Sequence, residues 1–316
     1  MQLRTLGRSG LQVAPLCLGG NVFGWTTNAA ASFKVLDAFV DAGLNFIDTA
    51  DVYSVWVPGH HGGESETIIG NWLKRGTPRN EVVIATKVGM EMAADRKGLS
   101  AAHIARSAEQ SLRRLQTDHI DLYFAHRDDP SVSFEETLGA FQALIEQGKV
   151  RAIGASNYTA PRLADALKVS REHGLPRYEV LQPLYNLYAR ADFESALEPL
   201  CLEQHVSVVS YYALASGFLS GKYRTPADAA KSARGEGVVA KFLNDRGLRI
   251  LAALDDVGQR YGTTPASVAL AWQIARPSID APIASATTVV QLNELVGATQ
   301  LQLDQAAIAQ LDTASA

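Results

Sequence analysis

The feature of the sequence that most restricts its fold is a regular alternation of two kinds of segment. Short runs rich in β-branched and aromatic residues alternate with longer runs in which apolar residues recur every three or four positions, as in strands and amphipathic helices. The predicted strands cover residues 15–20, 44–49, 82–87, 120–126, 151–156, 178–183, 206–212 and 280–285. The predicted helices between them cover residues 32–43, 65–76, 100–116, 133–149, 160–174 and 193–205.

This alternation predicts an α/β fold of parallel strands joined by right-handed crossovers. Eight such strands are enough for the sheet to close as a (β/α)8 barrel, whereas an open doubly wound sheet remains the alternative. No low-complexity linker or change in composition divides the 316 residues. We therefore predict a single domain over residues 1–316.

Composition and charge restrict the partners. The formal net charge is −4 and there is no run of Lys and Arg, which argues against a nucleic acid or an anionic membrane surface as partner. The sequence also lacks a secretion signal and an apolar run of the roughly 18 residues needed for a membrane span. Cys17 and Cys201 are the only cysteines, so no disulfide framework is expected. We predict a cytoplasmic protein that binds a small molecule.

Polar residues stand at the ends of six consecutive predicted strands. One polar residue at such a place is usually a cap or a turn, but six in succession indicate a site, because active sites of (β/α)8 barrels lie at the carboxyl ends of the strands. These residues are Asp48, Lys87, His126, Ser156 with Asn157, Gln182 and Tyr211.

Tyr53, five residues after Asp48, suggests proton transfer. A tyrosine hydroxyl has an ordinary pKa near ~10, and a lysine ammonium nearby would lower it. Burial would push Lys87 toward its neutral form unless a carboxylate opposed it, and Asp48 is the available counter-charge. His126 is expected to orient a carbonyl oxygen or to act as a second acid. A core histidine is the alternative.

These groups can protonate an oxygen but provide no nucleophile for carbon, and hydride from a nicotinamide would complete the reaction. Asn157 and Gln182 could hold a carboxamide, and Tyr211 could stack on a flat ring. The usual dinucleotide fingerprint is absent, because LGGNVFG has the wrong glycine spacing. The stretch GFLSGKY has too short a gap for a P-loop, and Tyr223 stands where Ser or Thr would bind magnesium.

Together, the motifs resemble those of the aldo-keto reductase family over nearly the whole chain. They are LRTLGRSGLQVAPLCLGG, GLNFIDTADVY, IATKVG, DHIDLYFAH, VRAIGASNY, LQPLYN, SYYALASGFLSGKY and VVQLNELVGA, in the order of the family. The resemblance implies a (β/α)8 barrel with an N-terminal β-hairpin and a long loop plus an extra helix after strand seven. It also implies reduction of small aldehydes or ketones with NADPH, or with NADH, with Tyr53 as acid supported by Asp48, Lys87 and His126.

The resemblance extends to the binding residues. Ser156, Asn157 and Gln182 would hold the carboxamide, Tyr211 would stack on the nicotinamide, and the loop from Leu214 to Lys222 would cover the pyrophosphate. The other residues implied to bind the cofactor are Gly20, Asn21, Ala215, Gly217, Arg224, Ser285, Thr287, Gln291 and Glu294. A substrate pocket would include Phe23, Trp56, His60, His61 and Arg127.

Three departures from the family pattern bear on specificity. Thr287 stands where the family commonly has a base near the 2′-phosphate, so Lys222 or Arg224 would have to substitute. Leu295 replaces an Asn that often faces the adenine. The segment SVWVPGHHGGESE lengthens the loop after Tyr53, and we interpret it as a lip over the substrate pocket, with a solvated insert as the alternative.

Other functions remain open. Lys87 could form a Schiff base, as in an aldolase, although that leaves Asn157, Gln182 and Tyr211 without a role. A cofactor-binding redox sensor, like the potassium-channel β subunits that resemble this family, and an NAD-preferring sugar or alcohol dehydrogenase are further alternatives. No metal site is expected, because His60 and His61 are adjacent in sequence and no third ligand is evident.

Overall fold

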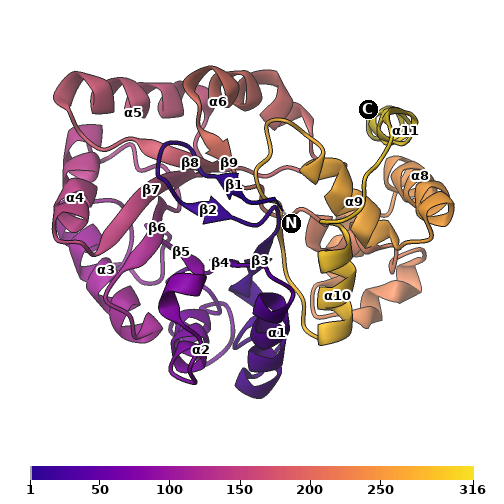
Figure 1. Cartoon of the computed structure of the whole chain (residues 1–316), viewed down its shortest axis with the longest axis horizontal. Helices are drawn as coiled ribbons and strands as arrows, with labels where there is room; N and C mark the ends of the chain where they lie inside the picture. The colour runs from indigo at the N-terminus through magenta and orange to yellow at the C-terminus, as the bar shows by residue number, and fades with distance from the viewer. Residues whose placement is uncertain (1) are drawn as a thin grey trace.

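The computed structural model describes residues 2–316 and contains a closed barrel of parallel strands (Figure 1). The strand order is β10-β3-β4-β5-β6-β7-β8-β9. The strands are β3 (Cys17–Gly19), β4 (Phe46–Asp48), β5 (Val83–Val88), β6 (Ile120–Ala125), β7 (Val150–Ser156), β8 (Tyr178–Gln182), β9 (Ser207–Val208) and β10 (Ile283–Ala284). The backbone N–H groups of Asp280 and Ile283 donate to the carbonyl oxygens of Val208 and Ser210, at 2.8 Å each, and so join the two ends of the sheet. The predicted (β/α)8 barrel is confirmed.

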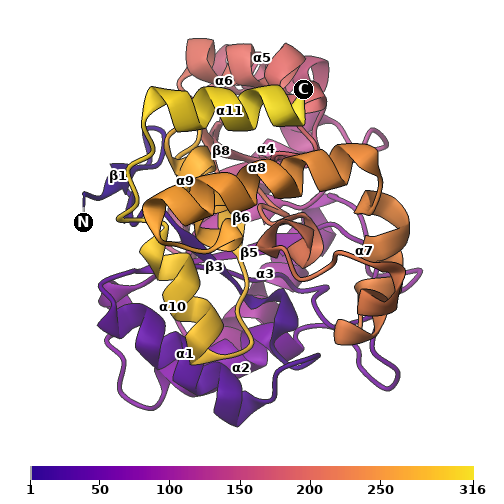
Figure 2. The ribbon, with the colours of Figure 1, turned by 90° about the vertical axis from the view of Figure 1, so that its right-hand side faces the viewer.

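Helices surround the barrel (Figures 1 and 2). Up to β9 they are α1 (Ala29–Asp41), α2 (Glu64–Leu73), α3 (Ala101–Leu115), α4 (Phe134–Glu146), α5 (Ala160–His173) and α6 (Glu198–Gln204). Ser100 and Ser133 cap α3 and α4 by accepting from the N–H groups of His103 and Glu136, which explains why these helices begin there. Within the described residues, no helix is long and apolar enough to cross a membrane.

The predicted helix over residues 193–205 is divided in two. Phe193–Leu197 forms a π-helical turn, and α6 follows it directly. Pro199 in the first turn of α6 has no N–H to donate to the preceding turn. The wider turn is therefore compatible with the missing hydrogen bond.

The segment after β9 is long and partly helical. It contains the 3₁₀ segments η4 (Ala215–Ser220) and η5 (Pro226–Lys231), followed by α7 (Gly235–Phe242), α8 (Asp245–Tyr261) and α9 (Pro265–Ile274). The chain ends with α10 (Val289–Gly297) and α11 (Gln305–Ser315), and α11 lies beside α8 (Figure 2). The long loop and extra helix predicted after the seventh barrel strand, which is β9, are therefore present.

An N-terminal hairpin closes one end of the barrel. Its strands β1 (Arg4–Thr5) and β2 (Gln12–Val13) are antiparallel, as predicted. The Arg4 guanidinium donates to the carbonyl oxygens of Ile274, Ile279 and Asp280 at 2.7–2.9 Å, which ties the hairpin to the segment before β10. A buried apolar cluster joins hairpin residues such as Leu6 and Leu11 to inward-facing strand residues. The hairpin therefore covers this end of the barrel with apolar side chains.

Strand alternation decides which side chains face the barrel interior. Residues two apart on a strand point to the same side, so Val83 and Ala85, which belong to the interior cluster, place Lys87 on the inner side of β5. Ile84 and Val88 point outward into the helix-facing core. The same rule places four further residues on the inner side, because each lies two positions after a residue of the interior cluster. These are Asp48 after Phe46, His126 after Leu122 and Phe124, Gln182 after Val180, and Tyr211 after Val209. The interior thus changes from apolar to polar at the carboxyl ends of the strands.

Helix α2, which follows the inserted loop, packs very closely on α3 at Gly70. A Cβ atom at Gly70 would lie 2.1 Å from the Arg114 carbonyl oxygen and 2.7 Å from the Leu115 carbonyl carbon. Real Cβ atoms do not approach backbone so closely, and the contact is with backbone that cannot swing aside. The position of α2 therefore depends on this glycine.

We expect Gly70→Ala to lower the free energy of unfolding by about 1–3 kcal/mol, because the added methyl must separate α2 from α3. Gly139→Ala is the matched control, since Gly139 lies inside α4 and no atom would lie within 4 Å of its added Cβ. The control should be neutral or stabilise by up to about 1 kcal/mol. Chemical denaturation of the two variants checks this, and equal stabilities would contradict the packing argument.

Candidate active site

Lys87, Asp48 and Tyr53 form a compact hydrogen-bonded group inside the barrel. Lys87 Nζ donates to Asp48 Oδ2 at 2.7 Å, to the Thr49 carbonyl oxygen at 2.8 Å and to the Tyr53 hydroxyl at 2.9 Å. The Tyr53 hydroxyl in turn donates to Asp48 Oδ2 at 3.0 Å. Lys87 is fully buried and Asp48 is 2% exposed. The convergence expected from the sequence is therefore present, and each charge has its counter-charge within contact distance.

The electrostatics of this group differ from expectation in one respect. Burial lowers the pKa of Lys87 and Asp48 opposes that shift, as anticipated. Burial also raises the pKa of Tyr53 well above its usual range, and the charge of Asp48 and its hydrogen bond with the phenol raise it further. The expected net lowering of the Tyr53 pKa is therefore wrong, because burial and Asp48 dominate over the nearby lysine. The phenol retains its proton throughout the neutral range.

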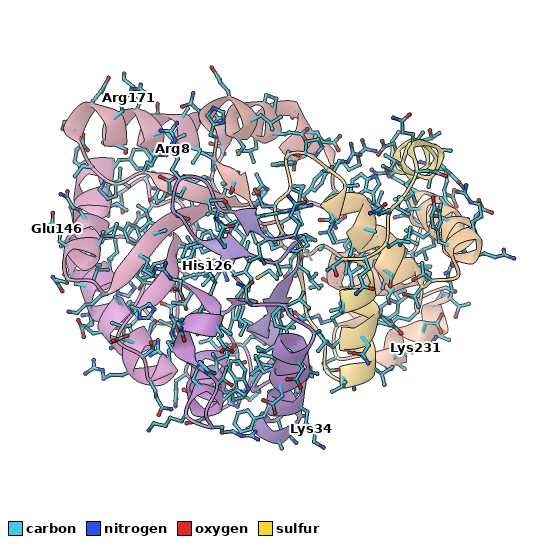
Figure 3. All side chains as sticks on the ribbon, in the orientation of Figure 1. Arg8, Lys34, His126, Glu146, Arg171 and Lys231 are labelled. Atoms are coloured by element: carbon cyan, nitrogen blue, oxygen red, sulfur yellow. The ribbon has the colours of Figure 1, made fainter. Side chains whose placement is uncertain are left out.

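His126 follows β6 and lies within the ring of strands, whereas Lys34 and Arg171 project from the outer surface (Figure 3). Its ring meets that of Tyr53 edge-on, with centroids 6.2 Å apart. Burial, followed by the charges of Lys87 and Arg127, lowers its pKa well below the usual value. The imidazole is therefore neutral at neutral pH, which favours a hydrogen-bonding role over that of a second acid. Its Nδ1 atom is buried without a hydrogen-bond partner among the described groups.

The amides expected to hold a carboxamide are already engaged. Asn157 Nδ2 donates to the His126 carbonyl oxygen at 2.8 Å, and its Oδ1 accepts from the Tyr211 hydroxyl at 2.9 Å. Gln182 Nε2 donates to Asp48 Oδ1 at 2.9 Å, so this amide also positions the carboxylate. Ser156 Oγ donates to the Gln182 carbonyl oxygen at 2.9 Å. One network therefore joins the amide side chains to the Lys87 group and fixes the phenolic end of Tyr211.

The loop after Tyr211 has the features of an anion site. Ala215, Ser216 and Gly217 all have positive φ, and successive residues with such dihedrals can turn backbone N–H groups into one concavity. A Cβ at Gly217 would lie 3.2 Å from Lys222 Nζ, so the ammonium is directly beside this turn. Within the described chain, Lys222 makes no ion pair within 4 Å. A positive group beside a left-handed turn fits the pyrophosphate of a dinucleotide.

Arg224 is held elsewhere. Its guanidinium donates to Asp255 Oδ1 at 2.7 Å and to the Gly221 carbonyl oxygen at 2.8 Å. A 2′-phosphate would have to compete with Asp255 for it. Lys222 is therefore the better candidate of the two cations for contact with a phosphate.

The remaining residues expected to bind a cofactor lie around β3 and β10. Ser285 Oγ donates to Asn21 Oδ1 at 2.6 Å, which joins the ends of these neighbouring strands. Thr287 N and Oγ1 both donate to Gln291 Oε1 at 2.9 Å, and Glu294 is one turn along α10. Packing at position 20 favours glycine, because an added Cβ would lie 2.8 Å from Ser65 Oγ and 3.0 Å from the Asp48 carbonyl oxygen. Leu295 is buried in the core rather than open to a ligand.

The inserted segment forms an aromatic edge beside Tyr53. Trp56 is 47% exposed, and its ring centroid lies 6.3 Å from that of Tyr53 and 5.5 Å from that of Trp25. His60 lies 3.9 Å from Glu64, and His61 is exposed. Of the other residues expected in the pocket, Phe23 is fully buried in the core and Arg127 is exposed beside His126. Trp56 is thus the member of this set that directly adjoins the phenol.

Some residues near the site carried no signal in the sequence. Glu66 on α2 is fully buried and accepts from Thr86 Oγ1 and Arg114 Nε at 2.6 Å each. Asp51 is buried without a partner for either carboxyl oxygen among the described groups, and burial, followed by the charge of Glu66, raises its pKa well above the usual value. Acidic residues in a turn and in the first turn of a helix look like surface residues in a sequence. Only the packing of α2 and α3 on the barrel buries them.

The described residues contain no group of three or more His, Cys, Asp or Glu side chains that could hold a metal ion. A phenol with its proton, a charged lysine and a neutral imidazole meet at the open end of the barrel. Such a set can bind and protonate an oxygen atom.

Comparisons with known proteins agree with this chemistry. The sequence model described as "Aldo/keto reductase family" matches residues 15–316. An uncharacterized oxidoreductase, YrpG of Bacillus subtilis, is 35% identical over 96% of this chain and 93% of its own length. A probable voltage-gated potassium channel subunit beta of Arabidopsis thaliana is 32% identical over 93% of this chain and 90% of its own. The norsolorinic acid reductase stcV of Emericella nidulans is 31% identical, over 96% and 79%. The chain belongs to the aldo/keto reductase family of NAD(P)H-dependent oxidoreductases.

Proposed function

We propose that this protein reduces small aldehydes or ketones to alcohols, with NADPH as the preferred cofactor and Tyr53 as the proton donor. The observation that most supports this is the group in which Lys87 Nζ donates to both Asp48 and the Tyr53 hydroxyl. When bound, the dinucleotide supplies the hydride that reduces the carbonyl carbon. The Tyr53 proton neutralises the oxygen, so the product is an alcohol.

Tyr53 suits this step although its pKa is raised. The phenol must be protonated before the reaction, and its environment keeps it so at neutral pH. The oxygen that receives the proton becomes an alkoxide, which is a stronger base than a phenolate, so transfer remains favourable. Lys87 stabilises the phenolate that remains, because its Nζ lies 2.9 Å from that oxygen.

His126 orients the substrate. A neutral imidazole keeps one N–H, and a donor beside Tyr53 can hold the carbonyl oxygen while the proton arrives. Asp48 acts through its neighbours, since its contacts are Lys87, Tyr53 and Gln182. The role that we assign to Asp48 is to keep Lys87 in its charged form.

The cofactor would be held by residues from several strand ends. Ser156, Asn157 and Gln182 would bind the carboxamide through the polar atoms that their internal network leaves free, and Tyr211 would stack on the nicotinamide ring. The turn at Leu214, Ala215 and Gly217 with Lys222 would take the pyrophosphate. For the adenosine part we assign the residues around β3 and α10, which are Gly20, Asn21, Ser285, Thr287, Gln291 and Glu294, with Arg224 as a secondary cation.

Trp56, with His60, His61, Arg127 and the backbone around Phe23, would border the substrate pocket. We also propose that residues 1–316 act as a single domain and that the protein works in the cytoplasm, with neither nucleic acid nor membrane as partner.

Two alternatives are less well supported. A Schiff-base enzyme needs a free, neutral lysine amine, whereas Lys87 already donates to Asp48, Thr49 and Tyr53. A redox sensor, suggested by the channel-subunit relatives, would not need all four of Tyr53, Asp48, Lys87 and His126.

A third alternative, an NAD-preferring sugar or alcohol dehydrogenase, uses the same site. Only cofactor measurements separate it from an NADPH-dependent reductase.

Tyr53→Phe removes the proton donor but keeps the ring. We expect kcat for aldehyde reduction to fall by about 10²- to 10⁴-fold, because a positioned general acid contributes on that order. The dissociation constant of NADPH, followed by nicotinamide fluorescence, should change little. Tyr261→Phe is the control, since that hydroxyl lies at the end of α8 and accepts from Asp304 N. A Tyr53→Phe enzyme with more than half of the normal rate would remove Tyr53 from the mechanism.

We expect Lys87→Met to lower kcat for aldehyde reduction nearly as much as Tyr53→Phe, but for a different reason. It removes the cation beside the phenol and leaves Asp48 buried without its counter-charge. Loss of the lysine raises the phenol pKa further and destabilises the phenolate, so any alkaline limb of the residual activity should shift to higher pH. Rates from pH 6 to 10, with the exposed Lys97→Met as control, check this. Covalent trapping of substrate on Lys87 by borohydride would instead establish the Schiff-base alternative.

Thr287→Arg tests the cofactor preference. A charge-assisted contact with a phosphate contributes roughly 1.5–3 kcal/mol, which corresponds to about 10- to 150-fold in affinity. We expect wild-type protein to prefer NADPH modestly and the variant to widen the ratio of NADH to NADPH dissociation constants within that range. NADH binding ten times more tightly than NADPH to the wild type would contradict the preference. An unchanged ratio in the variant would show that residue 287 does not face the 2′-phosphate.

A further inference from the structure

Arg234 lies over the aromatic edge that the inserted segment forms beside Tyr53. It precedes α7, and its guanidinium carbon lies 4.5 Å from the centroid of the Trp25 ring. Trp25 packs edge-on against Trp56 at 5.5 Å, and Trp56 lies 6.3 Å from Tyr53. Segments distant in sequence, from the β3–α1 loop, the inserted loop and the long segment after β9, therefore meet beside the proposed proton donor.

The charge of Arg234 has no acidic partner. Among the described residues, no carboxylate lies within 4 Å of its guanidinium, and the hydrogen bonds of Arg234 use its backbone N–H and carbonyl groups rather than the guanidinium. Burial lowers its pKa, and the ionisable groups that oppose this shift are the phenols of Tyr212, Tyr53 and Tyr223. Neighbouring arginines differ, because Arg224 is paired with Asp255 and Arg246 donates to two carbonyl oxygens.

A half-buried guanidinium without an anion loses hydration and gains no ion pair in exchange. An anionic group on a ligand would compensate for that loss. The planar fork of a guanidinium matches a carboxylate in geometry, and two parallel hydrogen bonds would fix its orientation. Arg127 adds a second positive charge near His126, where it contributes to the low pKa of that imidazole.

The substrate is a better source of this anion than the cofactor. The turn at Gly217 with Lys222 already provides a separate positive site for the pyrophosphate. Trp25 and Trp56 form a continuous set of contacts from Arg234 to Tyr53, and Tyr53 must contact the reacting oxygen if it donates the proton. An anionic group on the same small molecule as the carbonyl would lie between Tyr53 and Arg234.

We propose that the substrates are carbonyl compounds that carry a carboxylate, such as aldehydic or keto acids, and that Arg234 binds this carboxylate while Trp25 and Trp56 line its approach. This inference rests on the proposed reduction of carbonyl groups at Tyr53. It specifies the charge of the substrate, which the reaction itself leaves open.

The test compares two aldehydes of nearly equal shape, 4-carboxybenzaldehyde and 4-formylbenzamide. We expect the wild type to have the higher kcat/KM for the carboxylate. Arg234→Met, which keeps an unbranched side chain but removes the guanidinium, should lower the ratio of the two kcat/KM values by about 10- to 150-fold, mainly through KM. Arg234→Lys should restore part of the ratio. Arg171→Met, on the outer surface of α5, is the charge-matched control and should leave the ratio unchanged (Figure 3).

A binding measurement removes the dependence on turnover. Trp25 and Trp56 adjoin Arg234, so titration with 4-(hydroxymethyl)benzoate should change the tryptophan fluorescence, and the neutral 4-(hydroxymethyl)benzamide should bind at least tenfold more weakly. Arg234→Met should abolish this difference.

The outcomes separate the two proposals. If neither aldehyde is reduced with NADPH or NADH, the proposed function fails, and the fluorescence titration alone decides the role of Arg234. If Arg234→Met lowers both kcat/KM values equally and weakens NADPH binding, Arg234 serves the cofactor and the inference is overturned. A wild type that treats the two aldehydes alike also overturns it.

Discussion

The ion pair between Lys87 and Asp48 is the interaction on which the rest of the site depends. Two charges within contact distance inside a barrel are costly to desolvate, and the cost is acceptable only when other polar groups complete the arrangement. Thr49, Tyr53 and Gln182 supply those groups. Moving any of these strands by one residue would turn a member of the group outward, so the register of the barrel and the chemistry are fixed together.

Much of the fold could be predicted from the alternation of strand-like and helix-like segments in the sequence. Each of the eight predicted strands overlaps an observed one, and the polar residues at their ends do converge. Side chains of a strand alternate strictly, and in the structure Lys87 accordingly shares the interior side of β5 with Val83 and Ala85. Such local rules do not give the sign of a pKa shift. The balance of burial, Asp48 and Lys87 at Tyr53 depends on distances that only the folded structure supplies.

Contacts between distant segments were also beyond the sequence. Gln182 was expected to face a ligand, yet its amide nitrogen is bound to Asp48, which is 134 residues away in sequence. Arg234 lies in a segment whose composition suggests an ordinary surface loop, and its position over Trp25 depends on how that segment crosses the barrel. The strand ends thus provide groups that suit a common reaction. The loops determine which molecules can reach them.

The hairpin at the other end of the barrel affects this chemistry as well. Leu6 and Leu11 belong to the apolar cluster that fills the interior below Lys87, and Arg4 anchors them to the segment before β10. Electrostatic interactions weaken wherever water can enter, so the pairing of Lys87 with Asp48 is strong only while this end stays dry. The hairpin therefore keeps water away from the Lys87–Asp48 pair. A change far from the substrate, on the opposite side of the molecule, can alter the proton affinity of Tyr53 without touching any residue of the site.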